Sequence, residues 1–447
     1  MARGKKKEST LTPEEKLAQA LVPVEEQPYK VPENWCWVYL PNVCEYMRAG
    51  GDKPNIFSEE KTAELNIPVV ANGIQNEGII GFTDVENEKA GTITVSGRGT
   101  IGYPMLREYP YYPVVRLIVL APNKVILPSY LKNVFFCLEE EGTGSSIPQL
   151  TVPMLKGKVI PIAPLNEQQR IVDRIEYLFA KLDEAKEKAQ SVLDSFETRK
   201  AAILHKAFTG ELTAKWRAEH GVFDNSWSTV DITRIAKTEK DALKAGPFGS
   251  ALKKSMYVPE GYKIYGQEQV IAGDETIGNY YIDESKYQEL ISCRIAPHDI
   301  LISLVGTVGK VLVLSDACKP GIINPRLIKV SLDGRIMMPY FFKYYFESDS
   351  LKEKYKGESH GITMDVLNMR ILKMLPFPLC TLDEQAEIVR ILDSLLAKEQ
   401  QAKEAAESVL EKIDLLKKSI LARAFRGELG TNDPTEESAL ELLKKII

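Results

Sequence analysis

The sequence predicts an α+β protein in which two mixed α/β domains are separated by two long helices that pair as an antiparallel coiled coil with pseudo-twofold symmetry. Three observations lead to this fold class. A long helical segment occurs twice, both copies carry a regular apolar seam, and a segment rich in Val, Ile, Tyr, Pro and Gly precedes each copy.

The duplication is visible by direct alignment. Residues 165–212 and 382–429 align without a gap at a constant offset of 382 − 165 = 217, and close to half of the aligned positions are identical. Both copies end in Ala-Phe-x-Gly-Glu-Leu, at 207–212 and 424–429. The chain therefore uses one helical scaffold twice.

Each copy carries apolar residues at alternating steps of four and three, which is typical of a coiled coil. Arg199 interrupts the first seam and Glu399 the second. The first seam comprises Ile171, Ile175, Leu178, Leu182, Ala185, Ala189, Val192, Phe196 and Ile203, and the second comprises Ile388, Leu392, Leu395, Ala402, Ala406, Val409, Ile413, Leu416 and Ile420.

Two matching seams in one chain favour pairing with each other over the alternative, in which each helix packs only on its own domain. Asn166 and Asp383 are the expected N-caps of the two helices. Gly210 and Gly427 are the expected stops.

The segments before the helices are predicted to contain short strands between turns. The expected strands are 91–95, 112–120, 300–304 and 311–314. Both domains contain Gly-Thr-x-Gly, at 99–102 and 306–309, and otherwise diverge. One duplicated scaffold thus carries two different heads.

Short helices are expected near both ends of the chain. Thr12 precedes Pro13, Glu14 and Glu15 in the pattern of a capping box, and Asp433-Pro434-Thr435-Glu436 repeats that pattern before an apolar segment.

Composition narrows the class of protein. The net charge is 57 − 62 = −5 over 447 residues, which argues against a uniformly basic nucleic-acid coat but leaves local basic patches open. The six cysteines form no CxxC pair, which indicates reduced thiols without a disulfide frame or zinc site. With no apolar run long enough for a membrane span and no secretory signal at the start, we expect a cytoplasmic protein.

The search for a catalytic centre finds none. Residues 97–102 fit GxGxxG, but the prolines that follow at 104, 110 and 113 forbid the helix that would bind a pyrophosphate. Residues 306–311 match a phosphate loop only loosely, and the four histidines lie far apart in the sequence. No Pro-Pro pair occurs, so the motif of an amino-methyltransferase is missing.

Polar and basic residues on glycine-rich loops instead suit contacts with base edges and phosphates. The alternative, that any one of them belongs to a solvated turn, stays open. The candidate DNA-contacting residues are Asn72, Gln75, Asn76, Arg98, Thr100, Ser145, Ser146, Phe248, Gly249, Ser250, Lys253, Lys254, Thr307, Lys310, Ser359, His360 and Thr363.

From Val31 onward the chain resembles the specificity subunit of type I restriction–modification systems. The resemblance rests on the head–helix–head–helix order and on several motifs. They are Leu-x-Glu-Gln-x-x-Ile-Val at 165–172 and 382–389, Ala-Phe-x-Gly-Glu-Leu at each helix end, Gly-Pro-Phe-Gly-Ser at 246–250, the segments 299–303 and 321–326, and the opening 31–35. The first head lacks a Gly-Pro-Phe-Gly-Ser segment, so residue assignments there are weaker.

The resemblance implies two target recognition domains, each reading one half of an asymmetric bipartite DNA sequence, and two conserved spacer helices that set the gap. The implied chain is a non-catalytic reader. Its implied partners are double-stranded DNA, two modification subunits that methylate adenine N6, and two restriction subunits, without a membrane. It needs no cofactor itself, since S-adenosylmethionine, ATP and Mg²⁺ are expected on the partner subunits.

The expected division of the chain follows from this resemblance. It runs 1–28 N-terminal extension with a short helix, 29–164 recognition domain 1, 165–215 spacer helix 1, 216–380 recognition domain 2, 381–430 spacer helix 2 and 431–447 C-terminal helix.

Two other functions stay open. A self-sufficient DNA-modifying enzyme is disfavoured because its motifs are missing from the sequence. The other is a structural coiled-coil protein without a DNA role, which the absence of specific DNA binding in the presence of a modification subunit would support.

Overall fold

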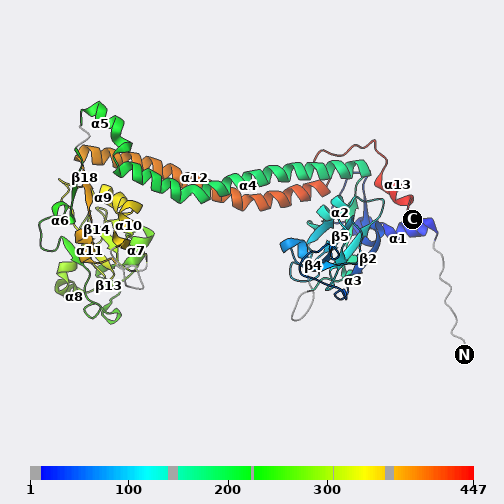
Figure 1. The fold of residues 1–447 in the computed structure, drawn as a ribbon, viewed down its shortest axis with the longest axis horizontal. Helices are drawn as coiled ribbons and strands as arrows, with labels where there is room; N and C mark the ends of the chain where they lie inside the picture. The colour runs from blue at the N-terminus through cyan, green and yellow to red at the C-terminus, as the bar shows by residue number, and fades with distance from the viewer. Residues whose placement is uncertain (1–11, 139–148, 223–225, 306, 358–366) are drawn as a thin grey trace. The chain divides into compact units, whose positions relative to one another are not determined.

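The structure is a computed structural model that describes residues 12–138, 149–222, 226–305, 307–357 and 367–447. They form two units. Unit 1 runs up to Gln190 and includes Glu407–Ile447, and unit 2 is Ser191–Ala406. Mixed helices and sheets, two long helices and two repeated domains confirm the predicted fold class (Figure 1). No helix in the described ranges is long and apolar enough to cross a membrane.

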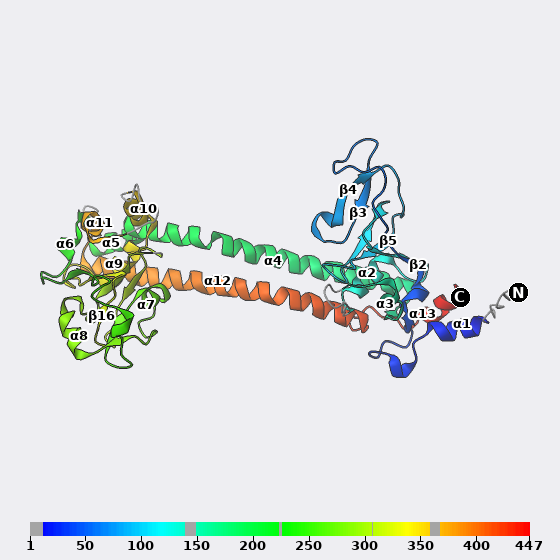
Figure 2. The ribbon, with the colours of Figure 1, turned by 90° about the horizontal axis from the view of Figure 1, so that it is seen from below.

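The head of unit 1 contains three small sheets. A four-stranded sheet has the order β2-β8-β5-β6, a three-stranded sheet the order β4-β3-β7, and β1 pairs with β9. Figure 2 shows β3 and β4 on the side of this head that lies away from α2 and α3. Its elements are α1 (Pro13–Ala20), β1 (Cys36–Tyr39), β2 (Cys44–Ala49), β3 (Ile67–Val70), β4 (Ile79–Thr83), β5 (Thr92–Val95), β6 (Pro104–Arg107), β7 (Tyr112–Pro113), β8 (Ile118–Pro122), α2 (Pro128–Phe135), α3 (Val152–Lys156) and β9 (Val159–Ile162).

The head of unit 2 repeats this topology. Its sheets have the orders β11-β17-β14-β15, β13-β12-β16 and β10-β18. In both three-stranded sheets the central strand pairs antiparallel with one neighbour and parallel with the other. Its elements are α5 (Ala214–His220), β10 (Ser228–Val230), α6 (Ile232–Ile235), β11 (Leu243–Ala245), β12 (Tyr262–Tyr265), α7 (Gln267–Ala272), β13 (Tyr281–Ile282), α8 (Glu284–Glu289), β14 (Ile300–Ser303), β15 (Val311–Val313), β16 (Gly321–Ile323), β17 (Leu327–Val330), α9 (Pro339–Phe346), α10 (Asp349–Gly357), α11 (Met369–Met374) and β18 (Phe377–Leu379).

The central strands are buried on both faces, which explains why β14 and β17 are nearly continuous apolar runs. The expected strands at 91–95, 300–304 and 311–314 are confirmed as β5, β14 and β15. The single strand expected at 112–120 is wrong. Val115 and Arg116 adopt positive φ values of 53° and 60°, so the chain turns there and passes from the three-stranded sheet into the four-stranded one.

The two long helices are α4 (Leu165–Phe208) and α12 (Leu382–Phe425). They run antiparallel in both units, where they lie side by side (Figures 1 and 2). In unit 1 Lys417 Nζ donates to Asp183 Oδ1 at 2.6 Å. In unit 2 Arg199 Nε donates to Glu399 Oε2 at 2.7 Å, in the middle of the predicted seam.

The seam of α4 matches the prediction, since none of its predicted members is exposed. The seam predicted for α12 is wrong in part, because Ala402, Val409 and Leu416 are exposed. The residues one position later, 403, 410 and 417, are partly buried in their place. Ala406 and Ile413 stay buried as predicted, so the contact line of α12 differs by taking two successive steps of four, from 395 to 399 and from 399 to 403.

The first turn of each long helix holds a buried Glu-Gln pair. Gln168 Nε2 donates to Val125 O at 2.9 Å and Ala163 O at 2.8 Å, and its Oε1 accepts from Leu127 N at 2.8 Å. Gln385 makes the equivalent three bonds in unit 2. Its Nε2 donates to Ile336 O at 3.0 Å and Cys380 O at 3.0 Å, and its Oε1 accepts from Met338 N at 2.8 Å. Each glutamine therefore fixes its helix to the loop before α2 or α9.

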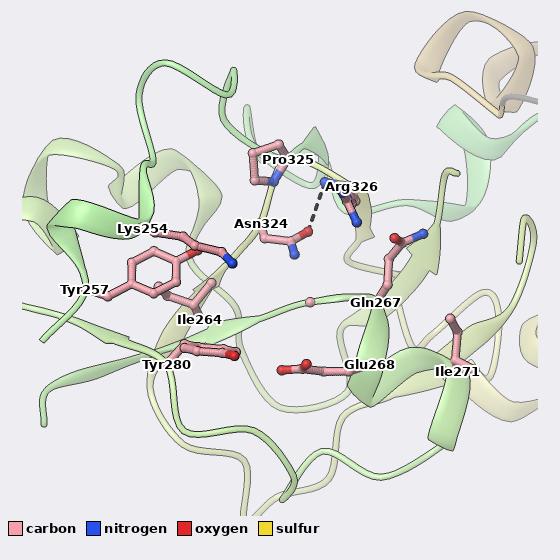
Figure 3. A pocket seen from close by; sticks show the side chains of 11 residues that line it. Lys254, Tyr257, Ile264, Gln267, Glu268, Ile271, Tyr280, Asn324, Pro325 and Arg326 are labelled. Carbon is pink, nitrogen blue, oxygen red and sulfur yellow. Dashed lines mark hydrogen bonds between the residues drawn. The ribbon is translucent and has the colours of Figure 1, made fainter. Parts of the chain in front are cut away.

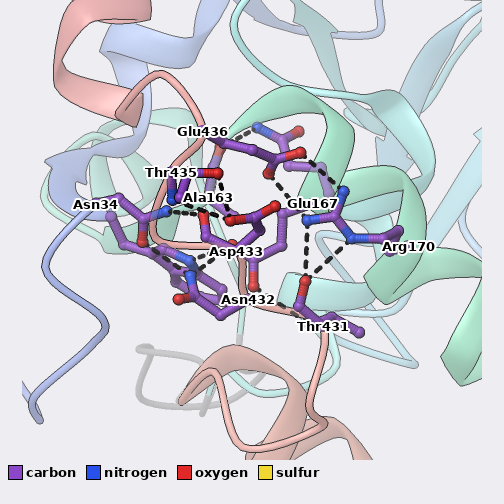
Figure 4. A network of polar contacts seen from close by, with 11 residues as sticks. Asn34, Ala163, Glu167, Arg170, Thr431, Asn432, Asp433, Thr435 and Glu436 are labelled. Atoms are coloured by element: carbon purple, nitrogen blue, oxygen red, sulfur yellow. Dashed lines mark hydrogen bonds and ion pairs between the residues drawn. The ribbon is translucent and has the colours of Figure 1, made fainter.

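The buried glutamates bind the chain that follows each partner helix. Glu167 Oε2 accepts from Trp35 Nε1 at 2.7 Å and Asn432 Nδ2 at 2.9 Å, as Figure 4 shows for the surrounding network. Arg170 forms a bidentate pair with Glu436, whose pKa it lowers. In unit 2, Glu384 Oε1 accepts from Thr213 Oγ1 at 2.7 Å and Arg217 Nη1 at 2.8 Å.

Several predicted helix ends need correction. Both long helices begin one residue before Asn166 and Asp383, so these residues lie in the first turn and do not cap it. The stops are confirmed, since Gly210 and Gly427 have φ values of 77° and 74°.

Of the two predicted starts of the terminal helices, one is confirmed and the other is wrong. The capping box at Thr12 is confirmed. The C-terminal helix α13 (Ala439–Lys444) is capped by Ser438, whereas Asp433 accepts from Thr435 in a separate turn. A helical pattern in the sequence therefore located both helices but only one of their starts.

The Arg199–Glu399 pair yields a first prediction. The offset of 217 maps Arg199 onto Leu416 and Glu399 onto Leu182, so the duplicate carries leucines at both positions. We expect Glu399→Leu to lower the free energy of unfolding by about 1 kcal/mol, since it leaves a half-buried guanidinium without its carboxylate. The double variant Arg199→Leu/Glu399→Leu should regain that loss, as measured by urea unfolding.

The matched control is Lys188→Ala, which removes an exposed ion pair with Glu184 and should leave the midpoint of urea unfolding unchanged. A double variant less stable than Glu399→Leu would contradict this account of the pair.

Candidate nucleic-acid interface

In the second head, loops from the four-stranded sheet and from the larger of the other two sheets lie at one edge, where the strands end. β11 and β14 both pair antiparallel with β17 and so point the same way, while β12 and β16 are parallel. The two sheets meet where these strands end, because Leu304 N donates to Arg326 O at 3.0 Å. We name the loops that follow β11, β12, β14 and β16 the loop edge of the second head.

The Gly-Pro-Phe-Gly-Ser segment begins at this edge. A Cβ on Gly246 would lie 1.8 Å from Asn324 O, so only glycine allows this approach of two backbones. Phe248 beyond it is 89% exposed, which is unusual for a large apolar side chain. Gly249, Ser250 and the two lysines at 253 and 254 are exposed as well.

A hollow of about 570 Å³ lies beside this segment (Figure 3). Its wall combines basic, acidic, amide and aromatic side chains. They belong to Lys254, Tyr257, Gln267, Glu268, Tyr280, Asn324 and Arg326, with Ile264, Gly266, Ile271 and Pro325 between them. Arg and Lys suit guanine or phosphate, Gln suits adenine, and Glu suits the amino group of cytosine. The aromatic rings add surfaces on which bases can stack.

The electrostatics of this wall follow from burial. Burial raises the pKa of Tyr257, with Tyr280 adding to the effect, so the phenol stays protonated as a hydrogen-bond donor. Burial also lowers the pKa of Lys263 behind the wall. Its Nζ donates to the carbonyls of Glu275 at 2.7 Å and Thr276 at 2.9 Å.

The hairpin between β14 and β15 borders the same hollow. Gln267 Nε2 donates to Val305 O, which ties the hairpin loop to the wall. Thr307 and Lys310 are exposed on this hairpin. The structure therefore brings Lys254, the Gly246–Ser250 segment and the hairpin together at one edge.

The first head has a matching loop edge after β2, β3, β5 and β7. Gly50 N donates to Leu117 O at 2.7 Å, as Gly246 N does to Leu327 O at 2.9 Å. A Cβ on Gly50 would lie 2.7 Å from Pro113 O. Gly50 thus takes the place of Gly246, although the first head lacks the Gly-Pro-Phe-Gly-Ser sequence.

The described members of the residues predicted in the first head lie on this edge. Asn72 Nδ2 donates to Val115 O at 2.9 Å and its Oδ1 accepts from Gly97 N at 2.8 Å, so its side chain joins three loops. Asn76 closes its own turn by donating to Ile79 O at 3.1 Å. Gln75, Arg98 and Thr100 are exposed.

Five predicted residues lie outside the described residues. They are Ser145, Ser146, Ser359, His360 and Thr363.

The structure adds residues that sequence reasoning missed. Arg326, Gln267 and Asn324 line the hollow, and Gly50 and Arg116 take corresponding places in the first head. A usable signal existed, because Arg-Leu-Ile occurs in both heads at 116–118 and 326–328. The three residues are too short a match to stand out without the shared topology.

No dinucleotide loop is formed at residues 97–102. The segment connects β5 to β6, an antiparallel pair, so no helix begins behind it. Within the described ranges no group of three His, Cys, Asp or Glu side chains could hold a metal ion.

Gly246 supplies a second prediction. We expect Gly246→Ala to lower stability by ~1–3 kcal/mol, because the new methyl group collides with the Asn324 carbonyl. Gly249→Ala is the control, since nothing lies within 4 Å of its Cβ position. Thermal unfolding of both full-length variants checks this, and equal midpoints would show that the close approach is not a constraint.

Comparison with known proteins agrees with this architecture. The family model of the type I restriction modification DNA specificity domain matches residues 32–193 and 248–411. The EcoBI specificity subunit of Escherichia coli is 25% identical over 340 residues, covering 72% of this chain and 69% of that protein. The StySPI specificity subunit of Salmonella potsdam is 25% identical over 464 residues, covering 93% and 96%.

Solved structures show the same fold. The HsdS subunit from Thermoanaerobacter tengcongensis superposes with a TM-score of 0.60 at 19% identity, covering 91% of this chain and all 100% of that one. With the family model matched in both heads and both long helices, the chain belongs to the type I restriction–modification DNA specificity family.

Proposed function

We propose that this chain reads an asymmetric, bipartite DNA sequence, with one half-site bound at the loop edge of each head. One observation carries the proposal: the same loop frame occurs twice in one chain, with different side chains on it. A duplicated frame gives two similar ways to lie on DNA, and different side chains give two different base preferences. The six-part division of the chain given above is part of this proposal.

Charge and side-chain type support a DNA ligand at the loop edge. The chain as a whole is acidic, yet Lys254 and Arg326 line the hollow of the second head. The predicted residues Phe248, Lys253, Thr307 and the others on exposed loops are proposed to contact bases or phosphates alongside them. Localised basic groups bind phosphates irrespective of net charge.

The long helices are proposed to set the distance between the half-sites. Each has 44 residues, equivalent to ~66 Å at ~1.5 Å per residue. The hydrogen bonds of Gln168 and Gln385 fix each head to the start of its helix, which a spacer requires.

The chemistry is proposed to belong to partner subunits. Two modification subunits would methylate adenine N6 with S-adenosylmethionine, and two restriction subunits would use ATP and Mg²⁺. The exposed flanks of the paired helices offer these partners a surface.

The direct test is selection of bound duplexes from random-sequence DNA by the full chain assembled with its modification subunit. We expect enrichment of two different short motifs at a fixed separation. Enrichment of no motif would contradict the DNA-reading proposal, and one motif repeated twice would contradict the assignment of a different half-site to each head.

The spacer proposal gives a third prediction. Three heptads inserted after Ala185 in α4 and after Ile413 in α12 lengthen both helices by about 32 Å. This is close to one DNA turn of ~34–36 Å, so both heads keep their rotational phase and the selected gap should grow by about nine or ten base pairs.

A single heptad inserted at both positions is the matched comparison. It adds about 10 Å, which is out of phase with the DNA helix, so specific binding should weaken. An unchanged gap in the three-heptad variant would rule out the helices as the spacer.

A further inference from the structure

Each head passes from its three-stranded sheet into its four-stranded sheet through the sequence Arg-Leu-Ile. The turns are built alike. Leu117 N donates to Val114 O at 3.1 Å, and Leu327 N donates to Asn324 O at 3.2 Å. Each leucine carbonyl then accepts from the glycine that follows β2 or β11. Arg116 and Arg326 therefore occupy equivalent positions.

Both arginines are exposed, and no ion pair within the described ranges involves either one. Two other arginines of the heads, by contrast, are committed elsewhere. Arg107 is 1% exposed and donates to Thr94 Oγ1 at 3.0 Å, and Arg335 pairs with Asp333 at 2.7 Å. An exposed guanidinium without an acidic partner keeps its five donors for a ligand.

The backbone of both arginines is held at the loop edge. Arg326 O accepts from Leu304 N at 3.0 Å, and the residue lines the hollow with Lys254 and Gln267 (Figure 3). Arg116 N donates to Gly50 O at 3.1 Å, and its φ of 60° is a conformation that non-glycine residues rarely adopt. Asn72 supports that conformation by donating to Val115 O.

We propose that Arg116 and Arg326 are equivalent phosphate contacts, one in each head, which set the register of each head on the DNA backbone. This inference rests on the proposed function. A residue that is the same in both heads cannot distinguish two different half-sites, whereas a phosphate is present at every step of DNA.

The residues around the arginines differ between the heads, as sequence reading requires. Phe248, for example, stands where the first head has Asp52, and both side chains are exposed. The division is therefore between a shared arginine that positions each head and varied neighbours that choose bases.

The test measures binding of the full chain, assembled with its modification subunit, to duplex DNA of mixed sequence over a range of salt concentrations. Arg326→Gln and Arg116→Gln should each weaken binding and reduce the slope of log affinity against log salt by about 0.9. The double variant should reduce it by about 1.8.

Matched controls lie near the opposite ends of the strands that follow the arginines. Arg335→Gln beyond β17 and Lys124→Gln beyond β8 should leave the slope unchanged. Circular dichroism and thermal unfolding of each variant exclude a folding defect as the cause.

A second readout separates phosphate from base contact. Duplexes selected by Arg326→Gln should carry the same motif as those selected by the unmodified chain. Loss of discrimination at one base pair, or an unchanged salt slope, would overturn the proposal. Failure of the unmodified chain to select any motif would instead overturn the proposed function.

Discussion

The buried glutamines Gln168 and Gln385 impose the constraint on which the rest of this structure depends. Each makes three hydrogen bonds to backbone groups that belong to the loop before its helix or to the loop before α2 or α9. A buried amide must be satisfied, so losing any partner costs ~1–3 kcal/mol. The orientation of each head on the first turn of its helix is therefore fixed, and the motif Leu-x-Glu-Gln-x-x-Ile-Val acquires a physical reason.

The first turn of each long helix also forms hydrogen bonds with the segment that follows the end of the other long helix. Glu167 accepts from Asn432, and Glu384 accepts from Thr213 and Arg217, which lie in the segments that follow α12 and α4. Within each unit, a head, the start of one helix and the chain beyond the end of the other helix thus form one hydrogen-bonded assembly. The duplication accounts for this similarity, since the duplicated helix places the same Glu-Gln pair in both units.

Divergence is concentrated where the scaffold does not constrain the sequence. The two loop edges share a glycine, at 50 or 246, where two backbones approach closely, and an arginine, at 116 or 326, that we propose contacts phosphate. Exposed side chains near them, such as Phe248 and Asp52 at corresponding positions, differ between the two heads. A fixed frame with variable loops can change its DNA preference without losing its fold.

The sequence predicted the elements that local patterns determine. The seven-residue repeat defined both long helices, and runs of β-branched residues defined β5, β14 and β15. It could not predict the turn at Val115 and Arg116, because an apolar run looks the same whether one sheet or two receive it. The changed step in the seam of α12 was missed for a related reason, since it depends on the geometry of the helix pair.

The candidate site was predictable only in its loops. The glycines and lysines of 246–254 stood out in the sequence, whereas the equivalence of Arg116 and Arg326 rests on strand pairing between distant segments. Asn72 was predicted to contact DNA because its residue type suits base reading. In the structure its side chain instead joins three loops through hydrogen bonds.

The most direct test of the account is methylome sequencing of cells that carry the neighbouring modification subunit, with and without this chain. The account predicts an asymmetric, bipartite N6-methyladenine motif that is present only when the chain is expressed. The same motif in both strains, or none in either while the complex still forms, would contradict the claim that this chain reads DNA.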